Sequence, residues 1–374
     1  MTDLMIMEVG VQNLGVQSRV KDINDFSFIP PSLANTNNIL EPISLDENGE
    51  YTFVASEIFS PSGALYDNEI KVLEWRRTID GCLVVEIYTT KQVNLFTNVK
   101  VKECLVSAKG PLFIQGQIEA DTVGIQAEAL GVSGSLQSNS SVILTAKQGI
   151  GLLAPINAEN LSIHAAYVHQ GANLHLNGHL DVSTQCFKQE PSVRTRINTL
   201  RLIAEQCELS GNFLVSNESF IVAKAWICGD NQSQSTLQFS AANYIRARNL
   251  QIRGDTEVCI GHPNRDDRSI FIINETMAVD KLAVMDFHHV NSFANELDNH
   301  GEFSLHGSMV EIKTLKQNGL FETERSLVKV VTHLDHRQAS SVLKNSRLVS
   351  FKTSCEGGLF SLDQCEFQGD SFSS

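Results

Sequence analysis

The 374-residue sequence has no apolar run close to the eighteen or so residues that a membrane-spanning helix needs. Its first residues, MTDLMIMEVGVQNLGVQ, lack a basic segment followed by an apolar block, so no secretory signal peptide is recognised. We therefore expect no membrane span. The protein is expected to be cytoplasmic or to be secreted by a route that needs no signal peptide.

Cysteine occurs eight times but never as a Cys-x-x-Cys pair, which excludes a zinc ribbon and a thioredoxin-type redox motif. Three of the cysteines, Cys186, Cys207 and Cys228, follow one another at equal intervals. We interpret them as reduced, buried residues that stack on one another in a repeating structure.

Basic residues are scarce. The chain has 29 Lys and Arg against 43 Asp and Glu, a net charge of −14, and residues 1–80 alone hold 13 acidic and 5 basic side chains. Non-specific binding to nucleic acid requires a basic surface. The composition therefore predicts that nucleic acid is not a partner.

A short motif recurs at a fixed interval. The segments LVSA, GIQA, ILTA and SIHA end at Ala108, Ala127, Ala146 and Ala165, 19 residues apart each time, and LIA and IVA end at Ala204 and Ala223. A second motif runs in phase with it as IQGQI (114–118), VSGSL (132–136), LLAPI (152–156), LNGHL (176–180) and LSGNF (209–213). Self-similarity at a constant period is typical of a repeat architecture.

Within each unit, apolar and polar residues alternate over short runs that end at Gly or Asn, as in strands joined by turns. A period of 19 is too short for two helices and lacks the leucine-rich repeat pattern. It suits one coil of an all-β, right-handed parallel β-helix, with Ala and Gly where bends bring the backbone close to the core. On the order of fifteen coils would stack at the ~4.8 Å strand spacing.

Two regions follow from this pattern. Residues 1–90 are acidic, do not repeat and are expected to form an irregular N-terminal cap, while residues 91–374 are expected to form the solenoid. The last residues, CEFQGDSFSS, stop inside a repeat motif. Because an uncovered sheet edge can pair with another chain, end-to-end or self-association through this coil is a predicted interaction.

Coils of 19 to 20 residues with Gly-x-apolar turns, as in GQIEA, GSLQS and NGHLDV, make residues ~95–374 similar to the right-handed β-helices of the filamentous-haemagglutinin type. Those proteins are large bacterial surface and secreted adhesins. The resemblance therefore implies a bacterial protein that works by binding.

The segment SIHAAYVHQGANLHLNGHL (162–180) contains four histidines: His164, His169, His175 and His179. Alternation directs His164, His175 and His179 outward. Their expected neighbours one period away are Thr145, Gly151 and Pro155, none of them a metal ligand. We therefore predict neither a metal site nor a cofactor here, and we interpret His288 and His289 as structural.

Three apparent interruptions of the repeat could carry chemistry: residues 184–199, 228–236 and 261–269. Asp266 and Asp267 in the third are adjacent, so on a strand they would point to opposite faces. Because this is not the arrangement of an acid–base pair, no catalytic residues are assigned.

The segment YIRARNLQIR (244–253) places Tyr244, Arg246 and Arg248 on one side of a strand. We predict a basic stripe that binds a protein or an acidic glycan. Its members are Tyr244, Arg246, Arg248, Arg253, Arg194, Arg196, Arg265 and Arg268. The favoured function is a non-enzymatic adhesin-like or scaffold protein. A polysaccharide-modifying lyase or hydrolase on the same fold, and an effector secreted without a signal peptide, are the alternatives.

Overall fold

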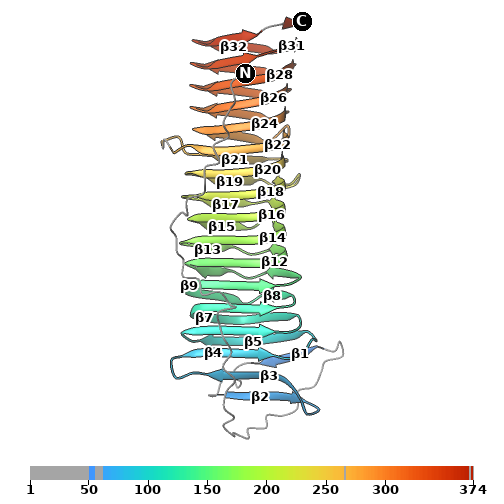
Figure 1. Cartoon of the computed structure of the whole chain (residues 1–374), viewed down its shortest axis with the longest axis vertical. Helices are drawn as coiled ribbons and strands as arrows, with labels where there is room; N and C mark the ends of the chain where they lie inside the picture. Colours follow the sequence, from blue (N-terminus) through green and yellow to red (C-terminus); the bar gives the residue numbers. More distant parts are fainter. Residues whose placement is uncertain (1–49, 55–61, 265–266, 370–371, 374) are drawn as a thin grey trace, which may run out of the picture. The chain divides into compact units, whose positions relative to one another are not determined.

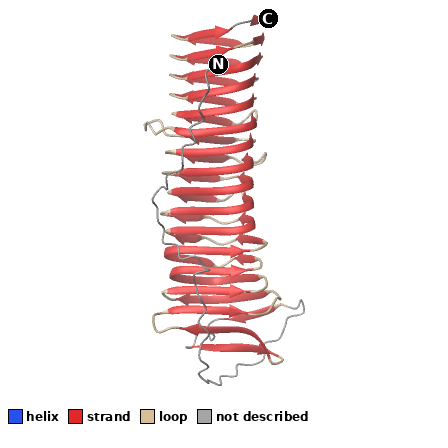
Figure 2. Cartoon of the chain, viewed as in Figure 1, coloured by secondary structure: helices blue, strands red, loops and turns tan. Residues whose placement is uncertain are grey.

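The structure is a computed structural model that describes residues 50–54, 62–264, 267–369 and 372–373. Most of the predicted N-terminal cap, residues 1–49 and 55–61, lies outside the described residues. Across the described ranges every regular element is a strand, and none is a helix (Figure 2). It follows that the described part of the chain has no helix long and apolar enough to cross a membrane.

The described strands form four groups, of which the second and third alternate along the chain. The first group is β1 (Tyr51–Val54), β2 (Ser62–Asp67), β3 (Ile70–Arg77), β4 (Cys82–Ile87), β5 (Val93–Lys100), β6 (Glu103–Ala108), β7 (Leu112–Ala127), β8 (Leu130–Val132), β9 (Ser135–Ala146), β10 (Gly149–Leu152) and β11 (Ile156–Ala158). Long strands that bend once are β12 (Asn160–Gln170), β14 (His179–Gln189), β16 (Thr199–Leu209), β18 (Ser219–Cys228), β20 (Asn243–Ile252), β22 (Ser269–Val279), β24 (Val290–Asn299), β26 (Met309–Gln317) and β28 (Leu327–Arg337). Short strands alternate with them: β13 (Leu174–Leu176), β15 (Arg194–Ile197), β17 (Asn212–Val215), β19 (Ser235–Phe239), β21 (Thr256–Ile260), β23 (Val284–His288), β25 (Glu302–His306), β27 (Leu320–Glu324) and β29 (Ser340–Lys344). The last group is β30 (Arg347–Ser350), β31 (Thr353–Glu356), β32 (Leu359–Asp363), β33 (Glu366–Gly369) and β34 (Phe372–Ser373).

Each turn of the chain adds one strand segment to each of three parallel sheets, here named faces A, B and C. Face A contains residues 160–165 of β12, face B contains residues 167–170 of the same strand, and face C contains β13; the equivalent segments of the other turns stack on these. On face A, for example, Leu161 pairs with Leu180 one turn later. About 15 turns stack in this way (Figure 1), which confirms the predicted parallel β-helix with coils of about 19 residues.

The N-terminal end of the stack departs from this pattern. Strands β2, β3 and β4 pair antiparallel in sequence order, whereas β4 also pairs in parallel with β6, and β1 with β5. Parallel stacking thus already includes residues 51–54 and 82–87, which precede the predicted boundary at residue 91. At this end of the stack the last strands are therefore the antiparallel strands β2, β3 and β4, and the edge that they form differs from that of a parallel ladder.

Alternation of inward and outward side chains builds one continuous core. In the turn formed by β16 and β17, the inward residues are Leu200 and Leu202 on face A, Cys207 and Leu209 on face B, and Phe213 and Val215 on face C, and all six are essentially inaccessible to solvent. Burial of a large apolar side chain contributes about 1.5–3 kcal/mol. A single turn has no second layer to bury these side chains, so its stability depends on the turns before and after it.

The alanine motif forms a column, as predicted. Ala127 pairs with Ala146 on face A, and Ala204 pairs with Ala223, which pairs in turn with Ala247. All five are buried. They lie where each long strand bends from face A to face B, a corner where a larger side chain would meet the neighbouring turns.

Two details of the predicted repeat are wrong. Residues 184–199 do not interrupt it: they form the second half of β14, a short turn and β15, and Leu180 pairs directly with Leu200. This turn is regular but has Thr184 where the neighbouring turn has Ala165, so the missing alanine motif was interpreted as an insertion. Nor do the three cysteines stack on one another. Cys207 lies between Phe187 and Trp226 instead, because the turns here are shorter than the interval between the cysteines. All eight cysteines are free thiols.

Candidate functional site

The structure places Tyr244, Arg246 and Arg248 on β20. Arg246 points outward from face A, between Val222 and Ile272 of the adjacent turns. Arg248 lies at the bend toward face B, where its Nε is 3.6 Å from Glu275 Oε1. Tyr244 and Arg246 therefore share one face, as predicted, whereas Arg248, which was predicted beside them, lies at the bend.

The other predicted members of the basic stripe lie elsewhere. Arg194 and Arg196 are exposed on β15, which belongs to face C. Arg253 follows β20 at the corner between faces B and C and donates a hydrogen bond to Gln251 Oε1 at 2.8 Å. Arg268 is exposed just before β22, and Arg265 lies outside the described residues. The described members thus occupy different faces and corners, and a binding role for them stays a prediction.

Around Arg246, face A carries an outward column of apolar side chains that we name the apolar ladder: Phe220, Tyr244, Ile270 and Met309. Register pairing places Phe220 beside Tyr244, Tyr244 beside Ile270, and Met309 two turns further on beyond Asn291. Phe220, Ile270 and Met309 are 37%, 43% and 51% exposed. The rings of Phe220 and Tyr244 stack with centroids 5.2 Å apart and planes 12° from parallel.

A second outward column runs beside the ladder: Val222, Ile272 and Phe293 are half-buried there, with Arg246 between Val222 and Ile272. Between the two columns lies a groove of about 300 Å³. Its lining consists of Ile270, Ile272, Asn291, Ser292, Phe293, Met309, Val310, Glu311, Leu327 and Lys329. The partly exposed apolar residues of the two columns, with polar residues among them, gather on one face, and such clustering, unlike isolated exposed residues, is typical of a binding site.

Arg246, like Arg194 and Arg196 on face C, lacks among the described residues the ion pair that many outward cations form. Stacking brings many cations beside carboxylates one turn away: Lys224 Nζ lies 2.5 Å from Glu205 Oε1, and Lys329 Nζ lies 3.1 Å from Glu311 Oε2. Arg246 forms no ion pair or side-chain hydrogen bond with any residue that the structure describes. An exposed guanidinium without an internal partner is available to a carboxylate of another molecule.

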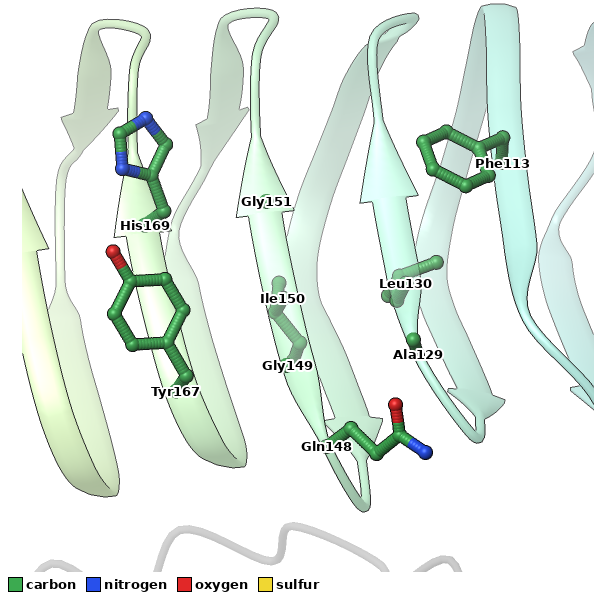
Figure 3. A pocket seen from close by; sticks show the side chains of 9 residues that line it. All are labelled: Phe113, Ala129, Leu130, Gln148, Gly149, Ile150, Gly151, Tyr167 and His169. Atoms are coloured by element: carbon green, nitrogen blue, oxygen red, sulfur yellow. The ribbon is translucent and has the colours of Figure 1, made fainter.

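Face B has a hollow of a different kind, shown in Figure 3. It measures about 420 Å³ and lies where Gly149 and Gly151 of β10 leave the outward positions empty, between Phe113 on one side and Tyr167 and His169 on the other. The sequence pattern did not predict it. Outward glycines at the same phase in two turns, Gly131 and Gly151, are the signal that could have revealed it.

The four clustered histidines lie on three different faces: His164 and His179 on face A, His169 on face B and His175 on face C. His164 pairs with Thr145, as predicted. The prediction for His175 was wrong. It lies between Asn157 and Arg196, because Gly151 belongs to face B and is opposite His169. His179 was also placed wrongly beside Pro155: its backbone N–H donates to Asn160 Oδ1 at 3.0 Å.

A group of metal-ligand side chains occurs further along face C. Cys259 on β21 is in register with Asp286 on β23, and His288 lies two residues after Asp286 on the same side of the strand. One ligand atom from each residue lies within 4.8 Å of the others. His306 of β25 stacks on His288 with ring centroids 4.8 Å apart.

Burial, with smaller contributions from the charges of Asp286 and Glu257, raises the pKa of the Cys259 thiol to about 12. Without a cation the thiol is therefore protonated at neutral pH and is not an activated nucleophile. The arrangement suits metal binding better than covalent catalysis, although an Asp and a His lie beside the sulfur.

This cluster was missed in the sequence because Cys259 and Asp286 are separated by more than one period, since the loop after β21 lengthens the turn between them. A detectable signal was present nonetheless. The segments CIG (259–261), DFH (286–288), SLH (304–306) and ETE (322–324) occupy equivalent positions in successive turns. In most of them the first and third residues, which point outward, are polar.

Comparison with known proteins gives no matching family model, no matching curated protein and no matching solved structure.

Proposed function

We propose that this protein is a non-enzymatic binding protein, adhesin-like or a scaffold, which binds a partner protein on face A. The contact surface is the apolar ladder together with Arg246. This combination is the observation that carries the proposal, because tyrosine and arginine within an apolar surface are the residue types that contribute most to protein–protein binding.

The aliphatic part of the ladder favours a protein over a glycan. Ile270 and Met309 offer no hydrogen bonds and present methyl and thioether groups to solvent. An apolar side chain of a partner would bury this surface, and the gain in binding free energy is about 25 cal/mol for each Å² of apolar surface buried. Glycan sites instead need several polar side chains around an aromatic ring.

Charge indicates what else the partner carries. The chain has a net charge of −14, yet Arg246 has no acidic partner among the described residues. A carboxylate at the centre of the partner's apolar patch would pair with it, and a guanidinium–carboxylate pair can be bidentate. We therefore propose a partner protein with an apolar surface that contains Asp or Glu.

The proposal is tested first by site-specific cross-linking. A photoreactive phenylalanine analogue is introduced at Phe220 on face A or, as the control, at Tyr167 on face B, which is exposed to a similar extent. The proposal requires a discrete cross-linked protein from position 220 that is absent from position 167. Identical cross-linking patterns at the two positions would contradict a specific role for face A.

Affinity for the purified partner is then measured with two double variants. Tyr244→Ala/Arg246→Ala is expected to weaken binding about 30-fold, since hot-spot truncations cost about 2 kcal/mol or more. Tyr167→Ala/Arg196→Ala removes the same side chains from faces B and C and is expected to bind like the wild type. A glycan array probed with the wild type and with Tyr244→Ala/Arg246→Ala tests the alternative that the partner is a glycan. If the wild type binds a glycan and the variant does not, the partner on face A is an acidic glycan and not a protein.

A further inference from the structure

A second surface, independent of the proposed binding function, is formed by Cys259, Asp286, His288 and His306 on face C. Three consecutive turns supply these residues, on β21, β23 and β25. Adjacent parallel strands are about 4.8 Å apart, so register alone brings Cys259 beside Asp286 and His288 beside His306. The backbone of the solenoid thus holds the four side chains together without any loop.

The polar atoms face one another. His288 Nε2 lies 2.8 Å from Asp286 Oδ2, and His306 Nε2 lies 3.4 Å from Asp286 Oδ1. The sulfur of Cys259, a carboxylate oxygen of Asp286 and a ring nitrogen of His288 lie within 4.8 Å of one another. A tetrahedral zinc ion with bonds of about 2.0–2.3 Å separates its ligand atoms by about 3.3–3.8 Å. For Cys259, Asp286 and His288, side-chain shifts of about 1 Å therefore suffice to bring the three ligand atoms around one ion.

The site is shielded on the inside and open on the outside. The side chains of His288 and Asp286 are 12% and 27% exposed, and His306 is 37% exposed. Asp286 Oδ1 is itself shielded from solvent and accepts no hydrogen bond from the described residues. Gly261 follows the paired strand β21 and lies against His288, where a Cβ atom would be 1.9 Å from the His288 carbonyl oxygen.

We propose that Cys259, Asp286 and His288 bind a divalent transition metal ion, with His306 as the fourth ligand. A thiolate, two imidazoles and one carboxylate form a tetrahedral donor set of the kind that zinc takes, whereas magnesium and calcium prefer oxygen ligands throughout. The ion would link three successive turns of face C beside the loop between β21 and β22.

The test uses the full chain and two metals. Calorimetric titration with Zn²⁺ is expected to give one ion per chain. Co²⁺, which takes the ligands of zinc, is expected to show a thiolate-to-metal charge-transfer band. Cys259→Ser should lose the band, and His288→Gln should weaken Zn²⁺ binding at least tenfold. Cys186→Ser and His164→Gln are the matched controls, because they remove a half-buried cysteine on face B and an exposed histidine on face A.

Far-UV circular dichroism of each variant separates loss of metal binding from loss of fold. Zn²⁺ should raise the unfolding temperature of the wild type and of both controls, since a ligand that binds only the folded state stabilises it, but not that of Cys259→Ser/His288→Gln. The proposal is overturned if the wild type binds neither ion, if it binds no more tightly than the double variant, or if the Co²⁺ band persists in Cys259→Ser. Loss of the effect in His306→Ala as well would confirm the fourth ligand; retention would restrict the site to three protein ligands.

Discussion

One substitution, glycine to alanine, should have opposite effects at two positions of this solenoid. Gly319 lies at the corner between faces B and C, where a Cβ atom would be 2.0 Å from the carbonyl oxygen of Gly301 and 2.7 Å from the carbonyl carbon of His300, both of the preceding turn. Gly151 lies on face B, where a Cβ atom would have nothing within 4 Å. Neither has a left-handed φ, so the difference between them is steric.

The magnitude follows from what each methyl group meets. At Gly319 the obstacle is backbone, which has no rotamer to change, so the two turns must separate locally at a cost of about 1–3 kcal/mol. At Gly151 the alanine fits and restricts the unfolded chain, which stabilises the protein by about 0.4–1 kcal/mol. We expect Gly319→Ala to lower the free energy of unfolding and Gly151→Ala to raise it.

Urea unfolding measures both variants, with the fluorescence of the buried Trp75 and Trp226 as the reporter. The urea midpoint should fall for Gly319→Ala and rise slightly for Gly151→Ala, while the slope of the transition stays unchanged. If both variants shift the midpoint in the same direction, or if Gly319→Ala matches the wild type, the close stacking of turns at this corner is refuted.

Three further predictions concern the core, the pH dependence and self-association. Phe239→Ala should lower the free energy of unfolding by about 3–5 kcal/mol, because the fully buried ring packs edge-on against Trp226; Phe351→Ala, at an exposed position, should change it by less than about 0.5 kcal/mol in the same urea titration. Burial lowers the pKa of His336 below its ordinary 6.5, so between the two pKa values the folded state binds fewer protons at this residue than the unfolded state. The stability that neutral His336 contributes is therefore present above pH 6.5 and is lost as the pH falls through the folded pKa. The unfolding temperature of His336→Gln should decline less steeply with falling pH than that of the wild type. Self-association through the C-terminal turn would involve the exposed Leu359 and Leu362 of β32, and Leu359→Asp/Leu362→Asp should then sediment more slowly than the wild type at equal concentration, whereas equal sedimentation of the two proteins would count against it.

The period of the repeat was enough to predict the β-helix, because alternation and turn residues are local properties of the chain. The interval between Ala127 and Ala146 is the register of the two strands that contain them. Inward and outward positions followed for the same reason: His164 and Arg246 are exposed, as the alternation predicts.

Which outward residues meet was decided only by the tertiary structure. Turns differ in length, so a constant period assigns neighbours correctly within a regular stretch and wrongly beyond an insertion. His175 was misplaced because Gly151, the neighbour assigned to it, is 24 residues away and not one period. A constant period also did not connect Cys259 with Asp286, because this turn is 27 residues long. It also could not show that Arg194 and Arg246 lie on different faces. A binding surface or a metal site on a solenoid consists of residues one turn apart. Which residues become neighbours depends on how many residues each strand and corner of that turn contains, and this is seen only in the folded coil.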